Sequence, residues 1–208
     1  MSATRHRLNE LLDESGLPML APESLLKFDA YLQLMLRWNA RINLTALRDE
    51  ESVLSRHFVE SIACAHHLPP GIESLLDFGS GAGLPGIPIA ICRPGLAVTL
   101  AESQNKKAAF LAEAVRQLGL RVKVVAGRGE DLQDWFDCVT LRAVDQMNQA
   151  VEASAHLVAS GGWLAAMTTE PDLPMIQRAA GDRFRWLESK ALPGSERRVL
   201  ALGRREAA

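Results

Sequence analysis

The sequence predicts an α/β fold in which a mostly parallel β-sheet carries helices on both faces. From about residue 70, short apolar runs alternate with segments whose apolar residues recur at helical spacing. A glycine-rich turn follows the first of these runs directly. The chain has 208 residues, of which 48% are hydrophobic and 23% charged, which suffices for one domain with a hydrophobic core.

The first third of the chain shows helical periodicity only. Helices are expected around residues 8–12, over 22–39, where Pro22 suits an opening turn, and over 50–66. Pro-Pro-Gly at 69–71 ends this part of the chain. We therefore expect an N-terminal helical region, residues 1–68, that packs on a core domain at 69–208 and does not fold alone.

Strand and helix patterns alternate after this break. Strands are expected at residues 74–78, 97–101, 122–126, 138–141 and 163–167, and helices at 84–92, 106–118, 146–158 and 172–180. This alternation is typical of a parallel sheet, because helical crossovers join parallel neighbours. Residues 199–202, which follow the turn residues Pro193 and Gly194, are expected to form a final edge strand.

Composition excludes several classes of protein. The formal net charge of −2 gives no support to a general nucleic-acid binder, although a local basic face stays possible. The three cysteines are far apart and form no C-x-x-C pair, so no zinc or iron–sulfur site is expected. The N-terminus has no signal-peptide core, and no apolar stretch is long enough to span a membrane. We therefore expect a cytoplasmic protein and, from the cysteine spacing, one without a metal.

The most informative segment is the turn after the first strand of the core domain. Gly79, Gly81 and Gly83 alternate there as G-x-G-x-G, immediately before a helical pattern. Glycines let the backbone bend tightly and approach a ligand closely. The dinucleotide fingerprint G-x-G-x-x-G fails because its last position is Leu84, and no G-K-[ST] follows to make a phosphate-binding P-loop.

Two acids accompany this turn. Asp77 lies two residues before the first glycine, where a carboxylate can hold the cationic amino-acid end of S-adenosylmethionine but would repel a pyrophosphate. Glu102 ends the next expected strand, where doubly wound folds place the acid that binds ribose hydroxyls. Each acid alone also fits a surface or capping role. Together, at the carboxyl ends of adjacent strands, they favour a nucleoside cofactor without a diphosphate. With the alternating strands and helices and the helical first third of the chain, the sequence predicts a Rossmann-like class I S-adenosylmethionine methyltransferase fold with an N-terminal helical extension.

Two later segments add candidates. Gly129 and Glu130 follow the third strand and can frame an adenine, or can form an exposed turn. Arg142 ends the fourth strand and is expected to face the crevice where cofactor and substrate meet. Its alternative is a buried structural arginine paired with a carboxylate.

The fourth strand also limits the chemistry. No Asn/Asp-Pro-Pro-aromatic element, which grips an exocyclic amine, follows it, and Cys138 lies inside the strand where a nucleophile for pyrimidine carbon is not expected. Attack by a free lone pair, such as that of guanine N7, remains. Such a reaction needs positioning and a suitable electrostatic environment but no general base.

The run D-F-G-S-G-A-G-L-P-G-I-P-I-A at residues 77–90 resembles the signature of the bacterial RsmG (GidB) family, the small-subunit ribosomal RNA guanine-N7 methyltransferases. Further similar elements follow in the family's order: Arg37-Trp38-Asn39, Ile42-Asn43-Leu44-Thr45, Arg56-His57 with Ser61, Glu102-Ser103, Lys106-Lys107, Phe110-Leu111, Arg128 and Arg142-Ala143. The resemblance covers nearly the whole chain and weakens after about residue 165.

This resemblance implies S-adenosylmethionine-dependent methylation of N7 of a guanine in the 530 loop of 16S rRNA, within the small ribosomal subunit. By position it implies cofactor contacts at Gly79, Leu84, Gly129, Glu130 and Arg142, beside the candidates Asp77, Gly81 and Glu102 named above. Lys106, Arg128 and Arg142 take its basic, RNA-facing or catalytic places.

Two positions depart from the family pattern. Thr168-Thr169 stands where a Lys-Gly is common, so one expected cation is missing from the RNA-contact surface. Glu60 stands where an Asp is common.

Three rival interpretations of the function remain. They are a small-molecule methyltransferase on the same fold, an NAD(P)-dependent oxidoreductase and a non-catalytic nucleotide sensor. Asp77 and the glycine spacing argue against the oxidoreductase. Naked rRNA and the assembled subunit both stay open as substrates.

Overall fold

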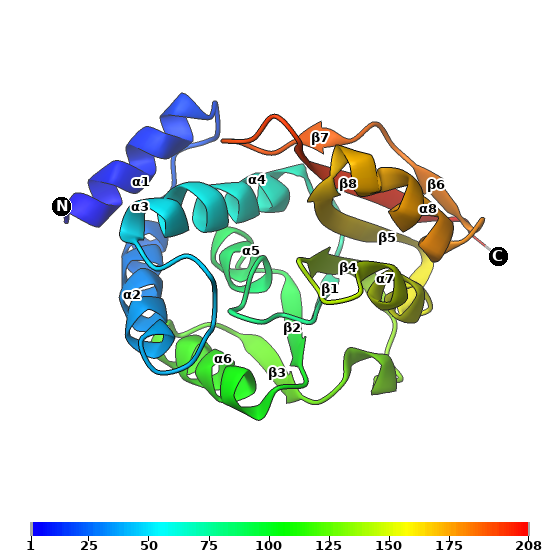
Figure 1. Ribbon diagram of the computed structural model, residues 1–208, viewed down its shortest axis with the longest axis horizontal. Helices are drawn as coiled ribbons and strands as arrows, with labels where there is room; N and C mark the ends of the chain where they lie inside the picture. Colours follow the sequence, from blue (N-terminus) through cyan, green and yellow to red (C-terminus); the bar gives the residue numbers. More distant parts are fainter. Residues whose placement is uncertain (1, 208) are drawn as a thin grey trace.

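A central mixed sheet organises the computed structural model, which describes residues 2–207 (Figure 1). Its strands run in the order β3-β2-β1-β4-β5-β8-β6, with β7 paired to β8. The strands are β1 (Ser74–Phe78), β2 (Ala97–Glu102), β3 (Val122–Ala126), β4 (Phe136–Arg142), β5 (Val158–Thr169), β6 (Phe184–Trp186), β7 (Lys190–Ala191) and β8 (Arg198–Arg205). β1 to β5 pair in parallel, whereas β8 is antiparallel to its neighbours.

Helices cover both faces of this sheet. They are α1 (Ala3–Glu14), α2 (Pro22–Asn39), α3 (Glu50–Ser52), the π-helical segment η1 (Val53–Phe58), α4 (Val59–His67), α5 (Gly86–Cys92), α6 (Asn105–Gln117), α7 (Met147–Ala155) and α8 (Leu173–Ala180), with short 3-10 turns η2 (Gly129–Asp131) and η3 (Glu170–Asp172). The N-terminal helices lie on the same side as α5 and α6, while α7 and α8 lie on the other (Figure 1).

Each face of the sheet has its own hydrophobic core because side chains alternate along a strand. In β1, the fully buried Leu75 packs into the core on the α5 and α6 side, and Leu76 packs into the opposite core. The N-terminal helices contribute to the first core. Tyr31 of α2 stacks on Phe58 with ring centroids 5.2 Å apart and lies 6.4 Å from Phe110 of α6.

The expected strands and helices are confirmed up to β4, with bounds that differ by at most two residues for these strands. The expected edge position of the last strand is wrong, since β8 lies between β5 and β6. β6 and β7 are too short to show a pattern. The helix expected at 146–158 ends at Ala155, and β5 already begins at Val158. The start of this strand is not visible in the sequence, because Gly161 and Gly162 have no side chains to contribute to an alternating pattern.

The helix expected at residues 50–66 is continuous but contains a π-helical stretch, Val53–Phe58, between α3 and α4. Such a stretch turns the following side chains to a different side of the helix. Among residues 2–207, none of the helices has both the length and the apolar character of a membrane span.

Candidate functional site

The glycine turn adopts a backbone that other residues rarely take. Gly79, Gly81 and Gly83 have φ angles of 69°, 55° and 84°, in the left-handed region that favours glycine. The Tyr31 hydroxyl, from α2, donates a hydrogen bond to the Ala82 carbonyl. An N-terminal helix therefore fixes the turn at the carboxyl end of β1.

Two adjoining cavities, of about 410 and 570 Å³, open at the carboxyl edge of the parallel strands. Both are lined by Gly79, Ser103, Val144 and Asp145, so they form one elongated cleft. The smaller cavity also contains Phe78, Gly127, Arg128, Gly129 and Glu130. The larger also contains Thr45, Arg56, His57, Gly81, Leu84, Glu102, Lys107 and Arg142.

Glu102 is fixed at the wall of the larger cavity. Its carboxylate accepts hydrogen bonds from the backbone N–H groups of Gly81, at 2.9 Å, and Gln104, at 2.7 Å. The side chain is almost fully buried. A carboxylate has about four lone-pair sites, so Glu102 can accept further hydrogen bonds from a ligand in the cleft.

Asp77 lies next to the turn, but it is buried and is not among the residues that line the two cavities. Its Oδ2 accepts from the Gly86 N–H at 3.1 Å and its Oδ1 from the Thr140 hydroxyl at 3.0 Å. Burial raises the pKa of Asp77 to about 6, although these hydrogen bonds oppose the rise. Asp77 thus joins β1 to the first turn of α5 and to β4. Its predicted contact with a cofactor stays a prediction.

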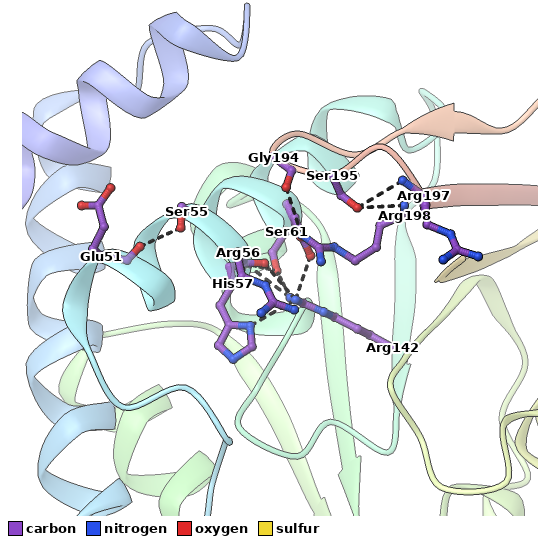
Figure 2. Close-up of polar contacts among 11 residues, drawn as sticks. Glu51, Ser55, Arg56, His57, Ser61, Arg142, Gly194, Ser195, Arg197 and Arg198 are labelled. Atoms are coloured by element: carbon purple, nitrogen blue, oxygen red, sulfur yellow. Dashed lines mark hydrogen bonds and ion pairs between the residues drawn. The ribbon is translucent and has the colours of Figure 1, made fainter. Parts of the chain in front are cut away.

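Arg142, at the end of β4, is held in a network with the segment Arg56–Ser61 (Figure 2). Its guanidinium donates to the Glu60 Oε2 at 2.9 Å, the Arg56 carbonyl at 2.9 Å, the His57 Nδ1 at 3.1 Å and the Ser61 Oγ at 3.2 Å. The other Glu60 oxygen lies 2.6 Å from Nη2 of Arg198, on β8. Glu60 is thus the carboxylate partner that a buried structural arginine requires, and Arg142 also lines the larger cavity.

Burial controls the charges of this network. It raises the pKa of Glu60 and lowers that of Arg142, while each partner's charge opposes the change in the other. Burial and the nearby Arg142 lower the pKa of His57 to about 3. His57 is therefore neutral at physiological pH. The guanidinium groups of Arg142 and Arg198 share one carboxylate, that of Glu60.

The structure brings most of the predicted site residues together. Those that line the cleft are Gly79, Gly81, Leu84, Glu102, Arg128, Gly129, Glu130 and Arg142. Lys106 is exposed in the first turn of α6, where its neighbour Lys107 lines the larger cavity. The Arg128 side chain is 72% exposed and lies 3.7 Å from Glu130.

Sequence reasoning did not name Asp145 and assigned no role to Ser103, although both line the two cavities. It also assigned no role to Thr45 and His57. The last two belong to N-terminal elements of the family resemblance. Their place in the cleft depends on how α2 and α4 pack on the sheet, which no local pattern reveals.

Comparison with known proteins gives consistent results. The family model GidB, described as rRNA small subunit methyltransferase G, matches residues 24–180. The chain is 46% identical over 140 residues to Ribosomal RNA small subunit methyltransferase G from Neisseria meningitidis, covering 66% of this chain and 67% of the relative. It is 44% identical over 168 residues to the protein of that name from Stenotrophomonas maltophilia, covering 79% of this chain and 78% of the relative.

Solved structures share the fold at low sequence identity. M. jannaschii TYW2 in complex with AdoMet superposes with a TM-score of 0.59 at 15% identity, covering 74% of this chain and 78% of that chain. A predicted O-methyltransferase from Agrobacterium tumefaciens gives 0.59 at 21% identity, covering 70% and 80%. These likenesses confirm the predicted Rossmann-like methyltransferase fold.

Proposed function

The chain belongs to the GidB family of rRNA small subunit methyltransferases G, and from this premise we propose that it methylates N7 of a guanine in the 530 loop of 16S rRNA, with S-adenosylmethionine as methyl donor. One observation carries the proposal. The stretch that matches the family model, residues 24–180, contains every residue that lines the cleft.

The cleft fits a nucleoside with an amino-acid tail. The backbone at Gly129 and Glu130 borders the smaller cavity and suits the adenine, and Glu102 suits the ribose hydroxyls. Gly79 and Gly81 leave backbone room for the amino-acid end. When bound, S-adenosylmethionine supplies a sulfonium methyl group, which the in-plane lone pair of guanine N7 can accept without first losing a proton.

The residues of the chain then have to position the guanine. A general base is unnecessary, and His57 does not offer one, because its Nδ1 already accepts from Arg142. Arg142 is rigid because Glu60, Ser61 and two backbone carbonyls hold its guanidinium. A fixed positive group at the cleft wall suits orientation of a reacting base.

Exposed cations near the cleft suit contact with RNA phosphates, and we assign Arg128 and Lys106 this role. The net charge of −2 argues against strong binding to any RNA, since non-specific affinity depends on phosphate neutralisation. We therefore propose the small ribosomal subunit as the substrate, and the cytoplasm as the place of action. No metal is required.

The N-terminal region, residues 1–68, and the methyltransferase domain, residues 69–208, are proposed to work as one unit. Leu44, Thr45 and Leu47 line the larger cavity together with residues of the sheet domain. Truncation of the N-terminal region should therefore remove part of the substrate site and expose apolar surface of the shared core.

Radiolabelled methyl transfer onto small subunits that lack the modification, followed by mapping of the modified base and atom, tests the proposal. Label on N7 of one 530-loop guanine is the expected result. Transfer to small molecules with none to the subunit would instead favour the rival small-molecule methyltransferase. S-adenosylhomocysteine should raise the unfolding temperature and NAD should not, because only a ligand of the native state stabilises it.

A further inference from the structure

The loop between α2 and α3 is held in place by one buried amide. The Asn39 Oδ1 accepts from the backbone N–H groups of Leu44, at 3.0 Å, and Thr45, at 3.2 Å. Its Nδ2 donates to the Leu47 carbonyl at 3.0 Å. Thr45, which lines the larger cavity, is therefore fixed although its loop has no regular secondary structure.

The direction of the hydrogen bonds next to Thr45 follows from Arg142. A guanidinium only donates, and Nη2 of Arg142 lies 3.1 Å from the His57 Nδ1. Nδ1 must therefore accept, and in the neutral imidazole the proton is on Nε2. The alternative tautomer would place two donors against each other. The Nε2–H then donates to the Thr45 Oγ1, which lies 2.6 Å away.

The Thr45 hydroxyl also accepts from the backbone N–H of Leu47, at 3.2 Å. A hydroxyl has two acceptor lone pairs and one proton. His57 and Leu47 use both lone pairs, so the remaining capacity of Thr45 is its O–H as a donor. The hydrogen bonds therefore all run in one direction: Arg142 donates to His57, and His57 donates to the Thr45 hydroxyl, which lies at the cleft.

We propose that the Thr45 hydroxyl donates a hydrogen bond to O6 of the target guanine and thereby selects guanine over adenine; this rests on the proposed function. N7 and O6 are neighbouring acceptors on the same edge of guanine, whereas adenine has an amino donor in place of O6. A hydroxyl that can only donate matches guanine and opposes the adenine amino group. His57 is then a positioning residue, because it sets the direction in which Thr45 donates.

The test compares Thr45→Val, which removes the hydroxyl at nearly constant shape, with Thr45→Ser, which retains it. Each is assayed on small subunits that carry either guanine or 2-aminopurine at the target position. 2-Aminopurine keeps N7 and lacks O6. Thermal unfolding and calorimetry with S-adenosylhomocysteine accompany the rates. Thr45→Val removes the acceptor of His57 and Leu47, so it should unfold at a lower temperature than the parent but remain folded at the assay temperature. The affinity of both variants for S-adenosylhomocysteine should match that of the parent.

On guanine subunits, Thr45→Val should lower kcat/KM by about 2- to 12-fold, the range for one hydrogen bond between uncharged groups. Thr45→Ser should retain most of the parental value. The parent should lose a similar factor on 2-aminopurine, and Thr45→Val should lose nothing more there. That non-additivity is the signature of a direct contact.

Equal losses for Thr45→Val on both bases would overturn the proposal, since the hydroxyl would then act independently of O6. A loss of S-adenosylhomocysteine affinity that accounts for the loss of rate would also overturn it, by assigning Thr45 to the cofactor. Failure of the proposed function looks different: the parent itself would not label N7 of the guanine.

Discussion

Replacing Glu60 by Gln tests the energetics of the charge network that holds Arg142. Glu60 is 1% exposed, and its two oxygens lie 2.9 Å from Arg142 and 2.6 Å from Arg198. The variant removes the carboxylate charge that these two guanidinium groups share and turns an amide N–H₂ toward one of them. Loss of one partner from a buried ion pair costs about 3–5 kcal/mol.

For a chain of this length, each kcal/mol lowers the unfolding temperature by roughly 2–4 °C, so Glu60→Gln should lower it by roughly 6–20 °C. Urea unfolding at neutral pH measures the free energy directly. Glu206→Gln is the matched control, because Glu206 lies 3.1 Å from Arg185 with both side chains more than half exposed. Exposed pairs contribute about 0–1 kcal/mol. If Glu60→Gln cost no more than this control, the network would be as well hydrated as a surface pair, and the argument for a rigid Arg142 would be wrong.

Three further outcomes follow from the site. Glu102→Ala should weaken binding of S-adenosylhomocysteine by about 1.5–3 kcal/mol, the range for hydrogen bonds to a charged group; calorimetry with an unchanged Kd would remove Glu102 from the cofactor site. Gly79→Val should abolish binding of S-adenosylhomocysteine, because the backbone φ of Gly79 is +69° and a Cβ there would lie 3.2 Å from Val144. Circular dichroism should show that most of the fold survives. Retained affinity for S-adenosylhomocysteine would contradict the predicted contact. Because the pKa of Asp77 is raised to about 6, its proton stabilises the folded state below about pH 4, and this stabilisation is lost as pH rises through 6. Asp77→Asn cannot titrate, so its stability relative to the parent should rise by about 2 kcal/mol between pH 4 and 7. An unchanged difference between the two urea-unfolding curves would show that Asp77 is hydrated.

Prediction of the fold from sequence succeeded where local pattern and tertiary environment agree. β1 and β3 have the expected bounds, since each is a short apolar run with a turn at its end. The first half of β5 was missed because Gly161 and Gly162 have no side chains to contribute to a pattern. β6 has three residues and pairs with β8 at the end of the sheet, so long-range pairing and not its own sequence makes it a strand.

In the candidate site too, residues placed by local pattern could be predicted and residues placed by tertiary packing could not. Gly79 and Glu102 could be predicted because each follows a strand, and strand ends of a parallel sheet meet at one edge. The environment of Arg142 could not, because its partner Glu60 is 82 positions away in the chain and reaches it only after α4 packs on the sheet.

The same holds for Thr45, whose position depends on an amide at the end of α2. In the proposed function, the sheet supplies the part of the cleft for the cofactor, and the N-terminal region supplies the part next to the reacting base. On the proposed function, variants such as Asn39→Ala, which release the loop but leave the sheet intact, should therefore lower the rate of methyl transfer far more than the affinity for S-adenosylhomocysteine. Calorimetry and single-turnover rates on the same protein measure both quantities, and equal losses in the two would mean that the loop serves the cofactor and not the base.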